Sequence, residues 1–202
     1  MTVALVLLLS GAGLVLSTRT LHMLAAYVAI ALTISFLVAA SASTSLLSLV
    51  LLAIATLLKV FVAPVGIVAF VRANPDADNL RPSLSAPLRL LLVLAFAIVS
   101  RTVAHVLGPS VPLQSVLAFI VLCGVGVLIV HRNLLAHVVG LLVLGAGVTL
   151  IGSALAPSLP ESVEFGATFD ALVSTFIGLA LLRAYFAHNP LLDVESLRRL
   201  RG

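Results

Sequence analysis

Four ionisable residues lie inside long apolar stretches of the sequence: Lys59, Arg101, His137 and Asp170. Near the centre of a lipid bilayer, a charged side chain costs about 2.5–3.5 kcal/mol and therefore needs a partner, water or a neutral state. Lysine, histidine and aspartate can exchange a proton, whereas arginine stays cationic. These residue types make Lys59, His137 and Asp170 candidates for proton or ion coupling, and Arg101 a structural intramembrane charge.

Lys59 lies near the midpoint of the apolar stretch 46–71. In a helix it would lie about 18–20 Å from either end, too far for its ammonium group to reach the membrane surface comfortably. Pro64 follows five residues later and is expected to free a carbonyl near Val60 and to kink the helix. Two roles remain open for Lys59: relaying charge, or pairing with a neighbouring subunit to hold an assembly together.

The overall composition indicates that these apolar stretches cross a membrane. Of 202 residues, 62% are apolar and only 9% are charged. Soluble domains contain about 45–50% apolar and about 25% charged residues, because they need a charged surface. The composition excludes a cytosolic enzyme, a nucleic-acid binder and a disordered chain, and it predicts an integral membrane protein.

The apolar stretches predict how many helices cross the membrane, since a spanning helix needs about 20 mostly apolar residues. Seven stretches meet or approach this length: 2–17, 21–41, 46–71, 88–107, 113–131, 134–155 and 165–187. The first has no basic residue ahead of it, so we expect a retained helix rather than a signal peptide. We therefore predict an all-α integral membrane protein with about seven transmembrane helices, divided into an N-terminal four-helix segment (1–110), a three-helix segment (111–190) and a short cytoplasmic tail (191–202).

The basic residues orient these helices. The opposite loops, 41–45, 108–112 and 156–164, contain no basic residue. By the positive-inside rule, the N-terminus is predicted to be outside and the C-terminus cytoplasmic. Nine of the eleven Lys and Arg residues fall on the predicted cytoplasmic side: Arg19, Arg72, Arg81, Arg89, Arg132, Arg183, Arg198, Arg199 and Arg201.

This orientation places the remaining ionisable residues at different depths. Arg101 and Asp170 fall in the outer half of the membrane at similar depth, so we expect them to form an ion pair. His137 falls about one turn inside the cytoplasmic end of its helix, where it could exchange protons with the interior or bond between helices. His105 and His131 lie at helix ends, where exposure is expected.

No metal or cofactor site is expected in this chain. Cys123 is its one cysteine, and an iron–sulfur site cannot be built from it alone; a small apolar role inside a helix is expected. The five histidines show no HxxxH or HExxH spacing, and no glycine-rich phosphate-binding loop is present. The sequence therefore indicates no catalytic site, and any redox centres belong to other chains.

The C-terminal three helices carry a set of motifs that consists of His131 to Leu135 (including Arg132 and Asn133), Gly140 to Leu142, Glu164 to Gly166, Asp170, and Gly178 to Leu182. With these motifs the chain resembles the hydrogenase-4 component E family, a membrane subunit of formate hydrogenlyase-type complexes, and Lys59 followed by Pro64 extends the resemblance upstream. Residues 113–187 are also similar to the K subunit of complex I and to the C subunit of the Mrp antiporter, which share the start of the middle helix.

The resemblance implies a non-catalytic membrane-arm subunit of a hydrogenase-4 or complex I-like redox complex in a bacterial or archaeal cell membrane. It implies roles in assembly and in coupling electron transfer to proton or cation translocation. The implied partners are an antiporter-like subunit, a membrane subunit resembling the H subunit of complex I, metal-bearing peripheral subunits and membrane lipid, but no nucleic acid.

Two alternatives remain. Leu142 and Gly145 stand where related subunits place membrane glutamates, which favours a purely structural scaffold. A stand-alone ion transporter is the other alternative, although the helices show no inverted repeat.

Overall fold

The computed structural model describes residues 2–41, 46–107, 114–155 and 160–186, and helices form in all seven predicted stretches. One of the seven is a continuous rod made of α3, the π-helical turn η1 and α4. Within the described ranges the elements are α1 (Thr2–Leu16), α2 (Thr20–Ser41), α3 (Leu46–Leu57), η1 (Leu58–Val62), α4 (Ala63–Ala73), the short 3-10 helix η2 (Pro75–Asp78), α5 (Ala86–Leu107), α6 (Gln114–Val130), α7 (Leu134–Leu155) and α8 (Pro160–Phe186).

Five of the described helices are long and apolar enough to cross a membrane: Thr20–Ala40, Leu49–Ala73, Ala86–His105, Leu134–Gly152 and Phe165–Ala184. The other two, α1 and α6, are apolar but shorter, at 15 and 17 residues. The all-helical architecture and these spans confirm the predicted class, a multi-pass membrane protein.

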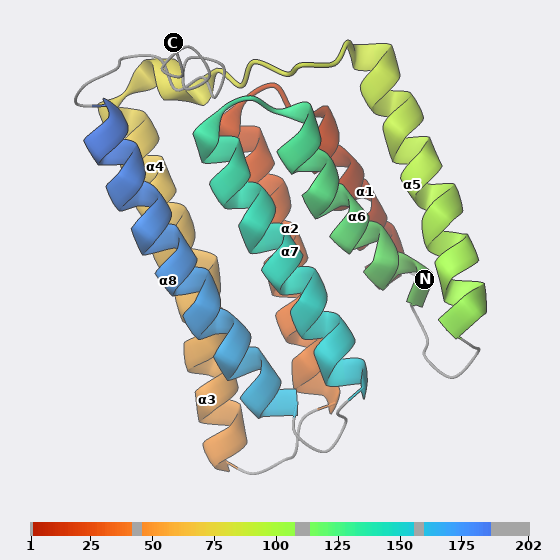
Figure 1. The fold of residues 1–202 in the computed structure, drawn as a ribbon. Helices are drawn as coiled ribbons and strands as arrows, with labels where there is room; N and C mark the ends of the chain where they lie inside the picture. Colours follow the sequence, from red (N-terminus) through yellow and green to blue (C-terminus); the bar gives the residue numbers. More distant parts are fainter. Residues whose placement is uncertain (1, 42–45, 108–113, 156–159, 187–202) are drawn as a thin grey trace.

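The helices form two stacked layers (Figure 1). One layer holds α1, α2 and the α3–α4 rod, and the other holds α6, α7 and α8. The layers pack in register, with α1 on α6, α2 on α7 and the α3–α4 rod on α8. Helix α5 packs against α6 and α1 at one end of this arrangement, while α8 and the α3–α4 rod lie at the opposite end. One continuous apolar core joins the layers.

The two layers repeat one topology in the same direction. Each helix of the second layer begins and ends 112–114 residues after its counterpart in the first. The spacing also appears in sequence, because Gly11 and Arg19 recur as Gly124 and Arg132. The α3–α4 rod is one residue longer than α8, as expected if its π-helical turn is a one-residue insertion. Lys59 lies in this turn.

The segment between α4 and α5 folds across one end of the bundle. The amide of Leu80 donates to the carbonyl of Thr18 at 3.0 Å, and the amide of Ser83 donates to that of Val130 at 2.7 Å. The Asp78 carboxylate accepts a 3.1 Å bond from the amide of Leu21, which satisfies a free donor at the start of α2. This segment therefore ties the ends of α1, α2 and α6 together.

Several predictions concern residues outside the described ranges. These are the predicted tail at 191–202 and most of the three loops that lack basic residues. The division of the chain at residue 110 stays a prediction.

Candidate functional site

Lys59 lies in the π-helical turn η1 and is buried, with 1% of its surface exposed. The turn lies inside the candidate span Leu49–Ala73. At 1.5 Å per residue, Lys59 is about 21 Å from the Ala73 end, close to the predicted depth. The structure thus places a lysine side chain inside the protein at membrane depth.

Pro64 lies five residues after Lys59 and has no N–H. In a π-helical turn, a carbonyl bonds to the amide five residues later, so Pro64 cannot be the donor to the Lys59 carbonyl. The hydroxyl of Tyr27 on α2 donates to that carbonyl over a long 3.5 Å. The change of helix type, at Leu58–Val62, thus lies directly before the proline, near the kink that the sequence predicts.

The two helices that contact this turn carry buried polar side chains. The η1 turn packs against α2 and α8, which also contact each other. Gly66 of the α3–α4 rod lies against Leu179 of α8, which fixes how the two are aligned along their length. Because the rod and α8 run in the same direction, Lys59 is level with the middle of α8. The buried side chains with polar groups on α2 and α8 are Thr20, Tyr27, Ser35, Thr168 and Thr175.

The predicted ion pair between Arg101 and Asp170 is wrong within one chain. Arg101 is on α5 and Asp170 is on α8, and Figure 1 shows these helices at opposite ends of the layers. Both residues are exposed. Similar depth could be read from the sequence, but lateral position in the membrane could not.

The motif at the start of α7 has structural roles. The side-chain oxygen of Asn133 accepts a 2.8 Å bond from the amide of Leu135, an N-cap that begins the helix. Gly140 lets α7 approach α6 closely, because a Cβ there would lie 2.9 Å from Leu128. Arg132 is exposed beside them.

His137 bonds within its own helix. Its Nδ1 donates to the carbonyl of Asn133 at 2.8 Å, and the ring is half-buried. The expected bond between helices is therefore replaced by one along α7. Since a carbonyl only accepts, Nδ1 is the donor in this bond.

His131 is buried, contrary to the expected exposure, whereas His105 is exposed as expected. The Nε2 of His131 lies 3.0 Å from the carbonyl of Ser17, at the end of α1. Burial lowers the pKa of His131 below its ordinary 6.5, and the nearby Arg89 and His137 act in the same direction. Hydrogen bonds to Ser17 and Val127 oppose this shift.

Arg89 is also buried at this end of the bundle, although its position suggested a helix edge. Its Nη1 donates to the carbonyls of Leu16 at 2.8 Å and Ser17 at 3.3 Å. These carbonyls end α1, where the helix dipole favours a cation. Arg89 therefore joins α5 to α1 as a buried cap, and hydropathy alone gave no signal for this contact.

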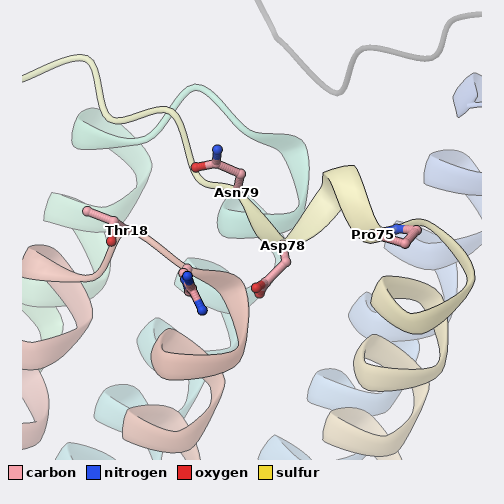
Figure 2. Close-up of a pocket in the computed structure, with 5 residues that line it drawn as sticks. Thr18, Pro75, Asp78 and Asn79 are labelled. Carbon is pink, nitrogen blue, oxygen red and sulfur yellow. The ribbon is translucent and has the colours of Figure 1, made fainter.

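A polar pocket of about 380 Å³ lies beside the cap (Figure 2). It is lined by Thr18, Arg19, Pro75, Asp78 and Asn79. Two of its members already bond to the protein, since Asp78 accepts from α2 and the Thr18 carbonyl from Leu80. The pocket therefore lies within the segment between α4 and α5 that ties the ends of the helices together, and its polar groups already serve that structural role.

Among the described residues, no group of three or more His, Cys, Asp or Glu side chains is placed to hold a metal ion. Cys123 is buried in α6, packed near Gly11 of α1. This agrees with its predicted role as a small apolar residue.

Comparison with known proteins finds similarity over part of the chain. Residues 112–202 match the family described as NADH-ubiquinone/plastoquinone oxidoreductase chain 4L, which is the K subunit of complex I. Over 129 residues, the chain is 29% identical to proteins described as hydrogenase-4 component E from Escherichia coli and from Shigella flexneri. The aligned region covers 63% of this chain and 60% of each relative, so the chain spans less than two thirds of their length.

No solved structure shows significant similarity to the chain. The resemblances expected from the motifs, to hydrogenase-4 component E and, in the C-terminal part, to the complex I chain, are confirmed by these matches.

Proposed function

We propose that this chain is a non-catalytic membrane-arm subunit of a hydrogenase-4 or complex I-like redox complex, and that it takes part in coupling electron transfer to proton or cation translocation. The observation that carries the coupling role is Lys59, buried at membrane depth in a π-helical turn. Ionisable groups inside membranes are costly and mark ion pathways by default. The similarity to hydrogenase-4 component E and to the chain 4L family supports the place in a complex.

The proposed topology has the N-terminus outside and the C-terminus in the cytoplasm. Basic residues gather at one end of the bundle, where the loops after α1, α4 and α6 meet through bonds at Thr18, Leu80 and Val130. Those loops hold Arg19, Arg81 and Arg132, and all three are exposed. A concentration of exposed arginine on one side supports a cytoplasmic location for that side.

The proposed partners are an antiporter-like membrane subunit, a membrane subunit resembling the H subunit of complex I, and peripheral subunits that carry the metal centres. Isolation of the chain from its native membranes in a mild detergent, followed by mass spectrometry, tests this. We expect hydrogenase-type metal-bearing subunits to co-purify with it. A monodisperse single chain that moves ions in liposomes would overturn the proposal.

The coupling role is tested by Lys59→Met in the assembled complex. Methionine removes the charge while keeping a long side chain, so we expect the complex to assemble with ion translocation per electron transferred reduced severalfold. Arg101→Met is the matched control, because it removes an exposed intramembrane charge and should leave coupling unchanged. Wild-type coupling in an assembled Lys59→Met complex would remove the coupling role.

A structural scaffold is the second candidate, favoured by the interior of α7. Leu142 is buried there and Gly145 is half-buried, at the two positions where related subunits place glutamates. Thr149 is the buried polar residue nearest to them along α7, and its hydroxyl bonds back to the Gly145 carbonyl at 2.8 Å. On this alternative, ions pass through other subunits, and Lys59→Met changes assembly but not coupling.

A further inference from the structure

Asp170 faces away from the protein in the apolar part of α8. The buried residues of this helix recur every three or four positions and face the α3–α4 rod and α7. Asp170 lies outside that stripe and is exposed. Among the residues that the structure describes, none bonds to its carboxylate. The buried stripe consists of Thr168, Ala171, Thr175, Leu179 and Leu182.

The carboxylate of Asp170 lies inside the apolar span of α8. Asp170 is five residues inside the candidate span Phe165–Ala184, which corresponds to about 8 Å of helix. Its side chain has only one methylene group, whereas Arg101, four residues inside its own span, has a stem long enough to bring its charge to the interface. Arg101 is therefore compatible with lipid, and Asp170 is not.

Charged residues in spanning helices almost always face protein or water, because lipid offers no compensation. The residues nearest to Asp170 on the helix surface, three and four positions away, are Gly166, Ala167, Val173 and Ser174. Small residues here let another helix approach closely, and the wider exposed face is apolar and suited to pack against it. The exposed apolar residues of this face are Phe165, Phe169, Val173, Phe176, Ile177 and Leu181.

We propose that the outer face of α8 docks against a transmembrane helix of another subunit, and that this helix presents a lysine or arginine at the depth of Asp170. The proposal rests on the proposed function, since it requires a membrane complex. Charge complementarity selects the occupant: lipid tails cannot neutralise the carboxylate, and a basic side chain can, through a charge-assisted hydrogen bond. The surface consists of Phe169, Asp170, Phe176 and Ile177.

A photo-crosslinking residue placed at Phe169 tests the face without removing the carboxylate. In membranes that contain the whole complex, we expect a crosslink to one membrane subunit, at a helix with a basic residue near the crosslinked site. Adducts with lipid alone would overturn the proposal, as would a crosslink to a second copy of this chain. Co-purification of the complex with the unlabelled chain is scored separately, so failure of the proposed function is distinguishable from failure of this interface.

Charge exchange then tests the chemistry. Asp170→Lys should lower the yield of intact complex about tenfold, because it puts two cations together in a low-dielectric interface. Changing the partner's basic residue to aspartate should restore the yield in that background. Arg101→Leu is the matched control and should leave the yield unchanged. Normal assembly of the Asp170→Lys variant, or absence of rescue in the exchanged pair, would overturn the proposed contact.

Discussion

The carbonyl of Lys59 accepts a hydrogen bond from the hydroxyl of Tyr27, 32 residues earlier in the chain, at 3.5 Å. This bond links α2 to the π-helical turn at the depth where the lysine is buried. Pro64, five residues after Lys59, has no N–H to donate to that carbonyl. The tyrosine hydroxyl and the proline therefore both bear on the hydrogen bonding of one main-chain group.

Tyr27→Phe removes the donor and keeps the ring. We expect a loss of about 0.5–1.5 kcal/mol in the free energy of unfolding, measured by circular dichroism in mixed micelles. In a Pro64→Ala background the alanine N–H can replace the hydroxyl as donor, so the same change should cost less. Equal costs in the two backgrounds would show that proline and tyrosine act independently.

Helix positions could be predicted from sequence because apolar length is set by the membrane itself. The predicted stretch 21–41 became Thr20–Ser41, and 134–155 became Leu134–Leu155. The last helix begins five residues earlier than expected, at Pro160, because a helix can continue past the apolar stretch through residues such as Glu161. Hydropathy marks where the apolar region ends and not where the helix ends.

Lateral packing could not be predicted in the same way. Lys59 was expected at depth and is there, but nothing in the local pattern connected it to Tyr27. Arg101 and Asp170 were expected to meet because their depths agree. Equal depth, however, does not determine where each helix lies in the plane of the membrane. His131 is buried by a segment about 50 residues earlier in the chain, through the bridge between it and Pro82. The recurrence of Gly11 and Arg19 after 113 residues was the sequence signal that could have revealed the two layers.

Arg89→Met should destabilise the chain although it removes a charge from a largely apolar protein. The variant removes the Arg89 donor from the carbonyls of Leu16 and Ser17, of which Ser17 keeps His131 as a partner. Hydrogen bonds to charged groups contribute about 1.5–3 kcal/mol each, so we expect a loss in this range on chemical unfolding. Arg81→Met is the control, since Arg81 is exposed and its loss should change stability by less than about 0.5 kcal/mol.

Acidification should destabilise the end of the bundle through His131. Its pKa in the folded chain is below the ordinary 6.5, so between the two values the unfolded chain binds more protons and stability falls as pH falls. The slope is at most about 1.4 kcal/mol per pH unit for one such group. Unfolding measured from pH 8 to pH 5 should show this decline below about pH 6.5.

His131→Gln removes the titrating group and keeps an amide donor near the Ser17 carbonyl. We expect the stability of this variant to depend less on pH over the same range. The exposed His105, changed to Gln, is the matched control and should retain the wild-type dependence. An unchanged pH profile in the His131 variant would assign the decline to other groups.

Two glycines allow the effect of close helix packing to be measured apart from that of helix propensity: Gly124 of α6, which faces α7, and Gly145 of α7, which has open space beside it. A Cβ at Gly124 would lie 2.9 Å from the Leu144 side chain and 3.1 Å from its main-chain nitrogen, whereas a Cβ at Gly145 meets nothing within 4 Å. Alanine favours a helix over glycine by about 0.5–1 kcal/mol at either position. Gly145→Ala should therefore be neutral or stabilising.

Gly124→Ala should instead destabilise by about 1–3 kcal/mol, because the main chain of α7 cannot yield as a side chain can. Unfolding in mixed micelles compares the two variants directly, since each adds one methyl group to a glycine in a long apolar helix. Equal stabilisation by both alanines would mean that the layers separate easily at Leu144. A loss confined to position 124 would instead identify the contact of α6 with α7 as rigid, a contact that any movement of α7 during coupling would have to preserve.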